Sequence, residues 1–170
     1  MELKKFRWFW AWDDEKEEAW LRAMAKEGWH FRQVEFPGRY VFAQGAFRDD
    51  VYRLDFFIDS KKKAEYLQLF QDAGWEYAGE YGSCQYFRKA AAPGEDPQIY
   101  TDNASKAAKY GRLMVFLVVF SPIWFIGLNR ASQSKEPVLQ ALTFIGFLFM
   151  LLYIYAMLKL IKRVSRLTKK

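Results

Sequence analysis

The chain is 170 residues long and carries a net charge of +6, with 26 Lys and Arg against 20 Asp and Glu. The excess of positive charge lies in the C-terminal part, because residues 1–92 hold 15 basic and 16 acidic residues whereas residues 93–170 hold 11 and 4. This distribution argues against a protein that binds nucleic acid directly, and the single cysteine excludes a disulfide within the chain and agrees with a reducing compartment.

A strand and a helix are expected first. Between Phe6 and Trp12 an aromatic residue occurs at every second position, which is the period of a β-strand. The pattern predicts that Phe6 and the three tryptophans share one apolar face and that Arg7 and Phe9 lie on the other. Asp13 or Asp14 is placed to cap the following helix, whose acidic first turn suits the helix dipole. The helix carries an apolar stripe and a glycine stop at Trp20, Leu21, Met24 and Gly28.

Two further strands follow, and the whole pattern then repeats. Strands over residues 29–36 and 39–44 meet at a Pro-Gly turn. The next residues predict a strand over 51–58, a helix capped by Asp59 or Ser60 and ended by Gly74, and strands over 75–81 and 84–89. A constant spacing of 46 residues relates Gly28-Trp29 to Gly74-Trp75 and Tyr40-Val41 to Tyr86-Phe87. The sequence therefore predicts an α+β domain over residues 1–90, in which two βαββ repeats form one antiparallel sheet with two helices on one face.

The other face of this sheet is expected to be uncovered, and it is our candidate for partner binding. It would present basic and aromatic side chains together, a mixture that suits a peptide, a partner protein or lipid headgroups. The alternative is a solvated face without a partner. The candidate residues are Arg7, Phe9, Arg53, Asp55 and Phe57.

Residues suited to catalysis or metal binding are scarce. His30 and Cys84 are the only histidine and the only cysteine, they fall in different repeats, and neither lies in a recognisable motif. A zinc site needs several such ligands at set spacings, and the acidic cluster 13–18 is explained by its position at a helix start. We therefore expect a non-enzymatic protein with no metal and no cofactor. An enzyme acting on a lipid is the alternative that would depend on His30 and Cys84.

Two apolar stretches in the C-terminal third predict a membrane hairpin. After a linker over residues 91–105, the juxtamembrane and transmembrane region is expected over 106–158, with spans from Leu113 to Leu128 and from Val138 to Leu158. These stretches lack ionisable side chains and approach or reach the about 20 residues that cross a bilayer, and the lack of charge argues against a transport pathway.

The flanking cations predict how the hairpin is oriented. Basic residues concentrate before the first span and after the second, which predicts a two-pass membrane protein with both termini in the cytoplasm. The basic tail over residues 159–170 is expected to contact anionic lipid headgroups. Its cations are Lys159, Lys162, Arg163, Arg166, Lys169 and Lys170.

Several short motifs, in a fixed order, carry a resemblance to a known family. They are Lys4-Lys5-Phe6, Gly28-Trp29-His30-Phe31, Tyr40-Val41-Phe42, Tyr52-Arg53-Leu54-Asp55, Gly74-Trp75, Tyr86-Phe87-Arg88 and Ile99-Tyr100-Thr101-Asp102. With these motifs the chain resembles the bacterial domain of unknown function 2812 family over nearly its whole length. The resemblance implies a cytoplasmic region joined to C-terminal membrane helices. Members are often encoded beside PadR-type transcriptional repressors, which implies a regulatory context, and no activity comes with the resemblance.

The sequence thus favours a membrane-anchored cytoplasmic domain that binds a protein or acts as a sensory or regulatory module, with a link to a PadR-type repressor. The alternative is a structural accessory subunit of a larger membrane complex such as a transporter, in which the hairpin makes the contacts and the soluble domain serves as a brace.

Overall fold

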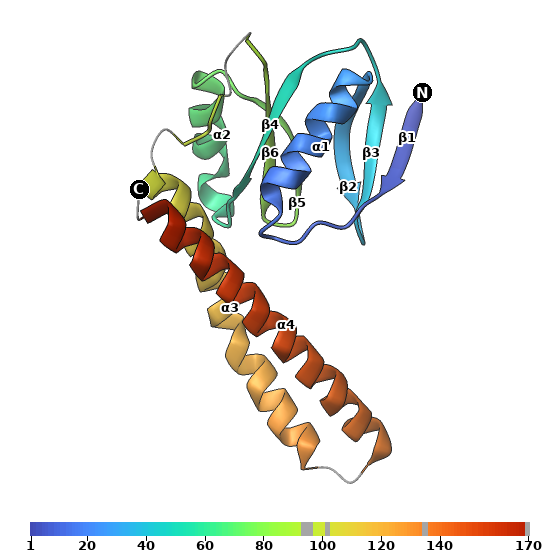
Figure 1. Cartoon of the computed structure of the whole chain (residues 1–170), viewed down its shortest axis with the longest axis vertical. Helices are drawn as coiled ribbons and strands as arrows, with labels where there is room; N and C mark the ends of the chain where they lie inside the picture. Colours follow the sequence, from blue (N-terminus) through green and yellow to red (C-terminus); the bar gives the residue numbers. More distant parts are fainter. Residues whose placement is uncertain (93–96, 101–102, 134–135, 169–170) are drawn as a thin grey trace. The chain divides into compact units, whose positions relative to one another are not determined.

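A computed structural model describes residues 1–92, 97–100, 103–133 and 136–168. The chain divides into two compact units, Met1–Thr101 and Asp102–Lys170. In the described residues, unit 1 holds six strands and two α-helices, and unit 2 holds two long helices (Figure 1). Ala91 and Ile99, which the sequence placed in a linker, pack against a buried cluster of unit 1.

The first sheet consists of β1 (Glu2–Phe6), β2 (Trp29–Glu35) and β3 (Arg39–Gln44), in the antiparallel order β1-β3-β2. The first strand therefore ends where the sequence predicted it to begin. Phe6 pairs with Arg39, the first residue of β3, so β3 has no residue left to pair with those that follow Phe6. The Arg7 N–H donates instead to the Gly38 carbonyl at 3.0 Å, in the turn between β2 and β3.

The second sheet consists of β4 (Asp50–Phe56), β5 (Glu76–Tyr81) and β6 (Cys84–Ala90), in the order β4-β6-β5. Both sheets thus use the same order of first, third and second strand. The expectation of one six-stranded sheet is wrong. The neighbouring strands β2 and β5 each carry a bulge, between Phe31 and Gln33 and between Tyr77 and Gly79. A bulge disrupts the regular row of backbone hydrogen-bonding groups along a strand, so these two strands lie side by side without joining the sheets. The bulges occur 46 residues apart, and a duplication of the sequence stays a prediction.

The two helices of unit 1 lie on opposite faces of the second sheet, and not on one face as expected. Helix α1 (Asp14–Lys26) packs against Tyr52, Leu54 and Tyr86, while α2 (Lys63–Asp72), which follows the short 3-10 helix η1 (Ser60–Lys62), packs against Val51 and Phe87. Successive residues of a strand point to opposite faces, so β4 and β6 each supply residues to both clusters. Both helices end as predicted, because Gly28 and Gly74 follow them with φ of 81° and 78°.

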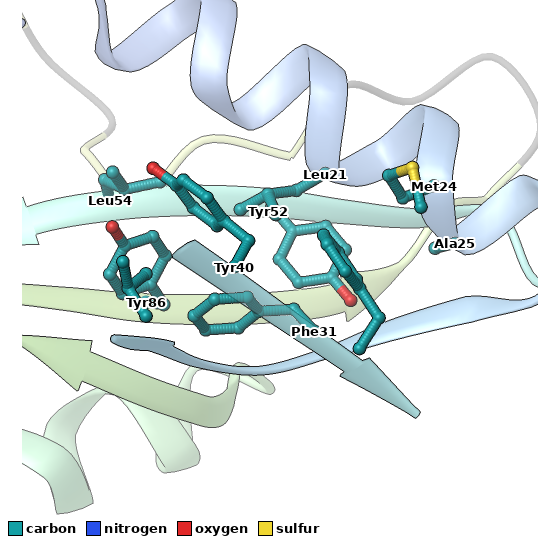
Figure 2. Close-up of a cluster of buried hydrophobic side chains, with 10 residues drawn as sticks. Leu21, Met24, Ala25, Phe31, Tyr40, Tyr52, Leu54 and Tyr86 are labelled. Carbon is teal, nitrogen blue, oxygen red and sulfur yellow. The ribbon is translucent and has the colours of Figure 1, made fainter. Parts of the chain in front are cut away.

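The main core lies between the two sheets, with α1 above it (Figure 2). Leu21 and Ala25 of α1 are fully buried, and Met24 is 2% exposed. They meet aromatic rings from both sheets, several of which are labelled in Figure 2. These rings belong to Phe31, Tyr40, Phe42, Tyr52 and Tyr86.

Unit 2 is a pair of antiparallel helices, α3 (Asn103–Ser132) and α4 (Pro137–Thr168) (Figure 1). Within the described residues, one helix is long and apolar enough to cross a membrane, namely α4. Of the two expected spans, the structure therefore supports the second, and α3 does not meet the same criterion over its described residues. The larger apolar side chains of α4 are mostly exposed, including Phe144, Phe147, Phe149, Leu151 and Leu158.

Candidate functional site

Arg7 and Phe9, two of the predicted partner-binding residues, lie in the segment that connects β1 to α1. The Phe9 ring points inward, with its centre 6.1 Å from that of Tyr40, which it meets edge-on, and 5.7 Å from that of Trp20, to which it is tilted. The Arg7 guanidinium stacks over the Phe9 ring at 5.2 Å and over the Trp20 ring at 5.0 Å. Arg7 therefore covers the outer side of Phe9 and remains exposed itself.

The other three predicted residues are covered by helices. Asp55 is 1% exposed and accepts a hydrogen bond from the Tyr66 hydroxyl of α2 at 2.9 Å, while Phe57 stacks on the Tyr66 ring at 3.9 Å. Arg53 forms an ion pair with Glu18 of α1 at 3.3 Å. The five residues thus divide into Arg7 and Phe9, of which only Arg7 is exposed, and a group covered by helices, and they do not form one uncovered sheet face.

The exposed feature next to Arg7 is a run of three tryptophans whose rings contact one another in turn, which we call the aromatic ladder (Trp8, Trp10 and Trp12). Trp8 meets Trp10 edge-on at 5.8 Å, and Trp10 lies nearly parallel to Trp12 at 5.3 Å with an interplanar angle of 4°. Trp8 is 54% exposed and Trp10 is 40% exposed. The two faces of this segment are therefore reversed relative to the sequence prediction, because Phe9 points into the core and the tryptophans point out.

Backbone contacts hold the ladder in place on both sides. The Arg7 N–H bonds to the Gly38 carbonyl, and the Asp13 N–H bonds to the Trp10 carbonyl at 2.8 Å. Gly38 has a φ of 129°, and a Cβ at this position would lie 3.0 Å from the Arg7 carbonyl oxygen and 3.7 Å from the Trp8 ring. A glycine is required for this close approach of the two segments. The ladder is thus fixed on the surface by the turn of the first sheet.

Cations surround the start of the ladder. Lys4 pairs with Glu35 at 3.3 Å and with Glu2 at 3.4 Å, and Arg39 pairs with the same Glu35 at 2.7 Å. The hydrogen bond to Glu35 raises the pKa of Lys4, and that to Lys4 lowers the pKa of Glu35. Lys5 is also exposed, so β1 and the ladder together present aromatic rings among basic side chains.

The buried carboxylate of Glu17 joins α1 to both sheets near the segment that carries the aromatic ladder. Glu17 of α1 accepts hydrogen bonds from the hydroxyls of Tyr40 in β3 and Tyr86 in β6, both at 2.6 Å. Burial, followed by the nearby Glu17 charge, raises the pKa of both tyrosines above the ordinary value of 10.0. Because Tyr40 also contacts Phe9, this network links both sheets and α1 to the segment that carries the ladder.

A family model for proteins of unknown function, DUF2812, matches residues 13–121, which is nearly two thirds of the chain. The chain belongs to this family. The matched part of the DUF2812 chain begins at the end of the ladder and covers α1, both sheets except β1, and most of α3. No curated protein and no solved structure matches the chain.

His30 and Cys84 of this DUF2812 protein lie in separate settings. His30 Nε2 lies 2.8 Å from the Ala46 carbonyl oxygen, and the half-buried Cys84 packs against the main core. Among the described residues, no group of three or more His, Cys, Asp or Glu is arranged to hold a metal ion.

The predicted headgroup-binding residues of the DUF2812 chain lie at the C-terminal end of α4. Lys159 and Lys162 are exposed, Arg163 is half-buried, and Arg166 is exposed in the last turn. Lys169 and Lys170 lie outside the described residues.

The sequence missed the ladder as a candidate site and also missed the role of Glu17. The tryptophans were assigned to the covered face of a strand, and Glu17 was assigned to the helix dipole. One signal for Glu17 was present in the sequence, since Tyr40 and Tyr86 are related by the 46-residue spacing.

Proposed function

We propose that this protein is a membrane-anchored, non-enzymatic binding domain that recognises a protein partner through the aromatic ladder and the neighbouring edge of β1. The observation that carries the proposal is the ladder itself. Tryptophan is among the residues most enriched where proteins bind one another, and three rings that contact one another and are held in place on a surface lose little entropy on binding.

The geometry favours an extended, acidic segment as the partner. Among the described residues β1 is the outer strand of the first sheet, and an outer strand offers one row of backbone donors and acceptors to a further strand. Lys4, Lys5 and Arg7 lie along this edge and favour acidic side chains in the partner. The family resemblance supplies one candidate, a PadR-type repressor, so that partner binding at the membrane would control its availability.

A photo-crosslinking amino acid placed at Trp8 tests partner binding in native membranes. The expected result is one protein adduct whose yield falls several-fold in a Lys4→Glu/Arg7→Glu variant. A Lys61→Glu/Lys62→Glu variant, which changes the charge equally on the exposed η1, should leave the yield unchanged. Three results would contradict the proposal. They are adducts with lipid alone, adducts with a second copy of the chain alone, and an equal yield of the protein adduct after charge reversal at Lys4 and Arg7.

Membrane anchoring by α4, paired with α3, is the second element of the proposal. It is supported by the exposed apolar side chains of α4, which water solvates poorly and lipid solvates well. We expect the full chain to resist extraction by alkaline carbonate and a Phe147→Arg/Leu151→Arg variant to be extracted. A reporter that is active only outside the cytoplasm should be silent when fused after the C-terminus and active in the turn near Gln133, which tests the two-pass arrangement with both termini inside.

A further inference from the structure

The antiparallel pairing of α3 and α4 brings together two basic groups that are far apart in the sequence. The first group, in the opening turns of α3, is Lys106, Lys109 and Arg112. The second group, in the closing turns of α4, is Lys159, Lys162, Arg163 and Arg166. Neither helix contains an Asp or a Glu, so the charge of this end of the hairpin is not offset within unit 2's helices.

Tyr110 shows directly that the two groups meet. The Arg163 guanidinium of α4 lies 4.9 Å from the centre of the Tyr110 ring of α3, and the Lys109 amine lies 5.5 Å from the same ring. Tyr110 is 1% exposed. A buried ring thus holds one cation from each helix near a common point, which fixes their positions better than two free surface side chains would be fixed.

The basic end coincides with the end of the apolar stretch. In α4 the exposed apolar residues continue to Leu158, and Lys159 follows at once. Twenty-one residues from Val138 to Leu158 make a helix about 31 Å long at about 1.5 Å per residue, which equals the about 30 Å thickness of the hydrocarbon core. In α3, Arg112 immediately precedes the apolar residues from Leu113 onward. Both basic groups therefore begin at the depth of the headgroups.

From this juxtaposition we propose that the basic end of the α3–α4 hairpin is a binding site for an anionic phospholipid headgroup, formed jointly by both helices. Arg163 is the central ligand, because a guanidinium on a ring keeps its donors in a plane that matches two phosphate oxygens. Lys109 completes the site from α3, and the remaining cations raise the local concentration of anionic lipid. The inference rests on the proposed membrane anchoring, and it extends the predicted basic tail to α3.

Binding of a soluble short-chain phosphatidylglycerol to the full chain in a neutral detergent tests the proposal. Native mass spectrometry measures the affinity, with phosphatidylcholine and inorganic phosphate as the competing probes. We expect phosphatidylglycerol to bind at least about tenfold more tightly than phosphatidylcholine, and a Lys109→Gln/Arg163→Gln variant to lose about thirtyfold, as two cations near a membrane surface contribute about 1 kcal/mol each. A Lys61→Gln/Lys62→Gln variant, which removes the same charge from unit 1, should change the affinity less than twofold.

Three results would overturn the proposal. These are equal binding of the two lipids, equal competition by inorganic phosphate, and a Lys109→Gln variant that binds as the unchanged chain does, since the last result leaves the tail of α4 as the whole site. Carbonate extraction of the same variants separates this inference from the anchoring proposal. A chain that stays in the membrane without preferring phosphatidylglycerol contradicts only the headgroup site, whereas a chain that is extracted contradicts the anchoring.

Discussion

The two halves of unit 1 have the same order of elements but use their helices differently. Helix α1 buries Asp14, Glu17, Glu18, Leu21, Met24 and Ala25 between two sheets, whereas α2 buries one residue among its described positions, Phe70, against the outer face of the second sheet. The apolar stripes are similar, since Trp20, Leu21 and Met24 correspond to Tyr66, Leu67 and Phe70 at a spacing of 46 residues.

The difference lies in the polar residues beside the stripes. Glu17 accepts bonds from two buried tyrosines, and Glu18 accepts a bond from the Leu54 N–H of the outer strand β4 at 2.9 Å. The corresponding positions of α2 are Lys63 and Ala64, of which Lys63 pairs with Glu80 near the surface. Buried polar groups need partners, so a helix that supplies acceptors is able to lie between two sheets. Helix α2 has a similar apolar stripe but no acceptor at these two positions, and it lies on the outer face of the second sheet.

The largest difference in unfolding free energy is expected between variants of the two matched leucines, Leu21 in α1 and Leu67 in α2. A Leu21→Ala variant should lose about 4 kcal/mol of unfolding free energy, because a fully buried leucine leaves a cavity between the sheets. A Leu67→Ala variant should lose about 1.5 kcal/mol, since Leu67 is half-buried. Urea unfolding of the detergent-solubilised full chain, followed by tryptophan fluorescence, gives both values. Equal losses would show that both helices lie at equivalent depths.

Replacing the carboxylate that joins the sheets should have the next largest effect. A Glu17→Ala variant leaves the hydroxyls of Tyr40 and Tyr86 without their acceptor, and we expect a loss of about 3 kcal/mol. The matched Lys63→Ala variant removes an ion pair near the surface, and should lose less than about 1 kcal/mol. A Glu17→Gln variant, which keeps one acceptor oxygen, should fall between the two in the same urea experiment. If Glu17→Ala unfolds at the urea concentration of the unchanged chain, the network does not stabilise the fold.

The comparison shows which features the sequence could predict. The order of strands and helices, the α+β class and the helix ends at Gly28 and Gly74 follow from local periodicity and from glycine conformation, and these predictions are confirmed. The family assignment is also confirmed. Local patterns carry this information because each depends on residues that are near one another in the chain.

The predictions that were wrong concern features that depend on contacts between residues distant in the sequence. The length of β1 is set by where β3 begins, and the exposure of Trp8 and Trp10 follows from that early end. A two-residue period distinguishes two faces but does not say which face is covered. The segment that contains Arg7 and Phe9 was therefore predicted with its exposed and buried faces reversed. Asp55 and Phe57 were placed on an open face because the sequence pattern did not show which face of the second sheet α2 covers.

The paired bulges offer a further way to sharpen the comparison. Gly79 has a φ of 147°, and a Cβ there would lie 3.1 Å from the Arg32 carbonyl oxygen on the neighbouring strand β2. A Gly79→Ala variant should lose about 2 kcal/mol because alanine disfavours this backbone conformation and the space is closed. The matched position of β2 is Gln33, which is exposed, and a Gln33→Ala variant should be nearly neutral. Equal urea midpoints for the two variants would mean that the sheets do not approach closely at this point.

The unfolding free energy at alkaline pH tests the link between the two halves of unit 1, with the smallest expected effect. Burial raises the pKa of Tyr40 and Tyr86 above the ordinary value of 10.0, so folding favours the protonated hydroxyls. Their contribution is fully present well below pH 10 and is lost progressively as the pH approaches and passes 10, because the unfolded chain releases protons that the folded chain retains. At pH 10.0 the ionisation of the two groups in the unfolded chain should have reduced the unfolding free energy by about 0.8 kcal/mol relative to pH 8.

Burial also raises the pKa of Tyr52, so part of the pH dependence will remain in any variant that keeps this residue. A Tyr40→Phe/Tyr86→Phe variant should therefore show a shallower loss between pH 8 and pH 10 than a Tyr81→Phe control, which keeps both hydroxyls bonded to Glu17. Identical slopes would show that the hydroxyls of Tyr40 and Tyr86 do not link α1 to the second half of the unit.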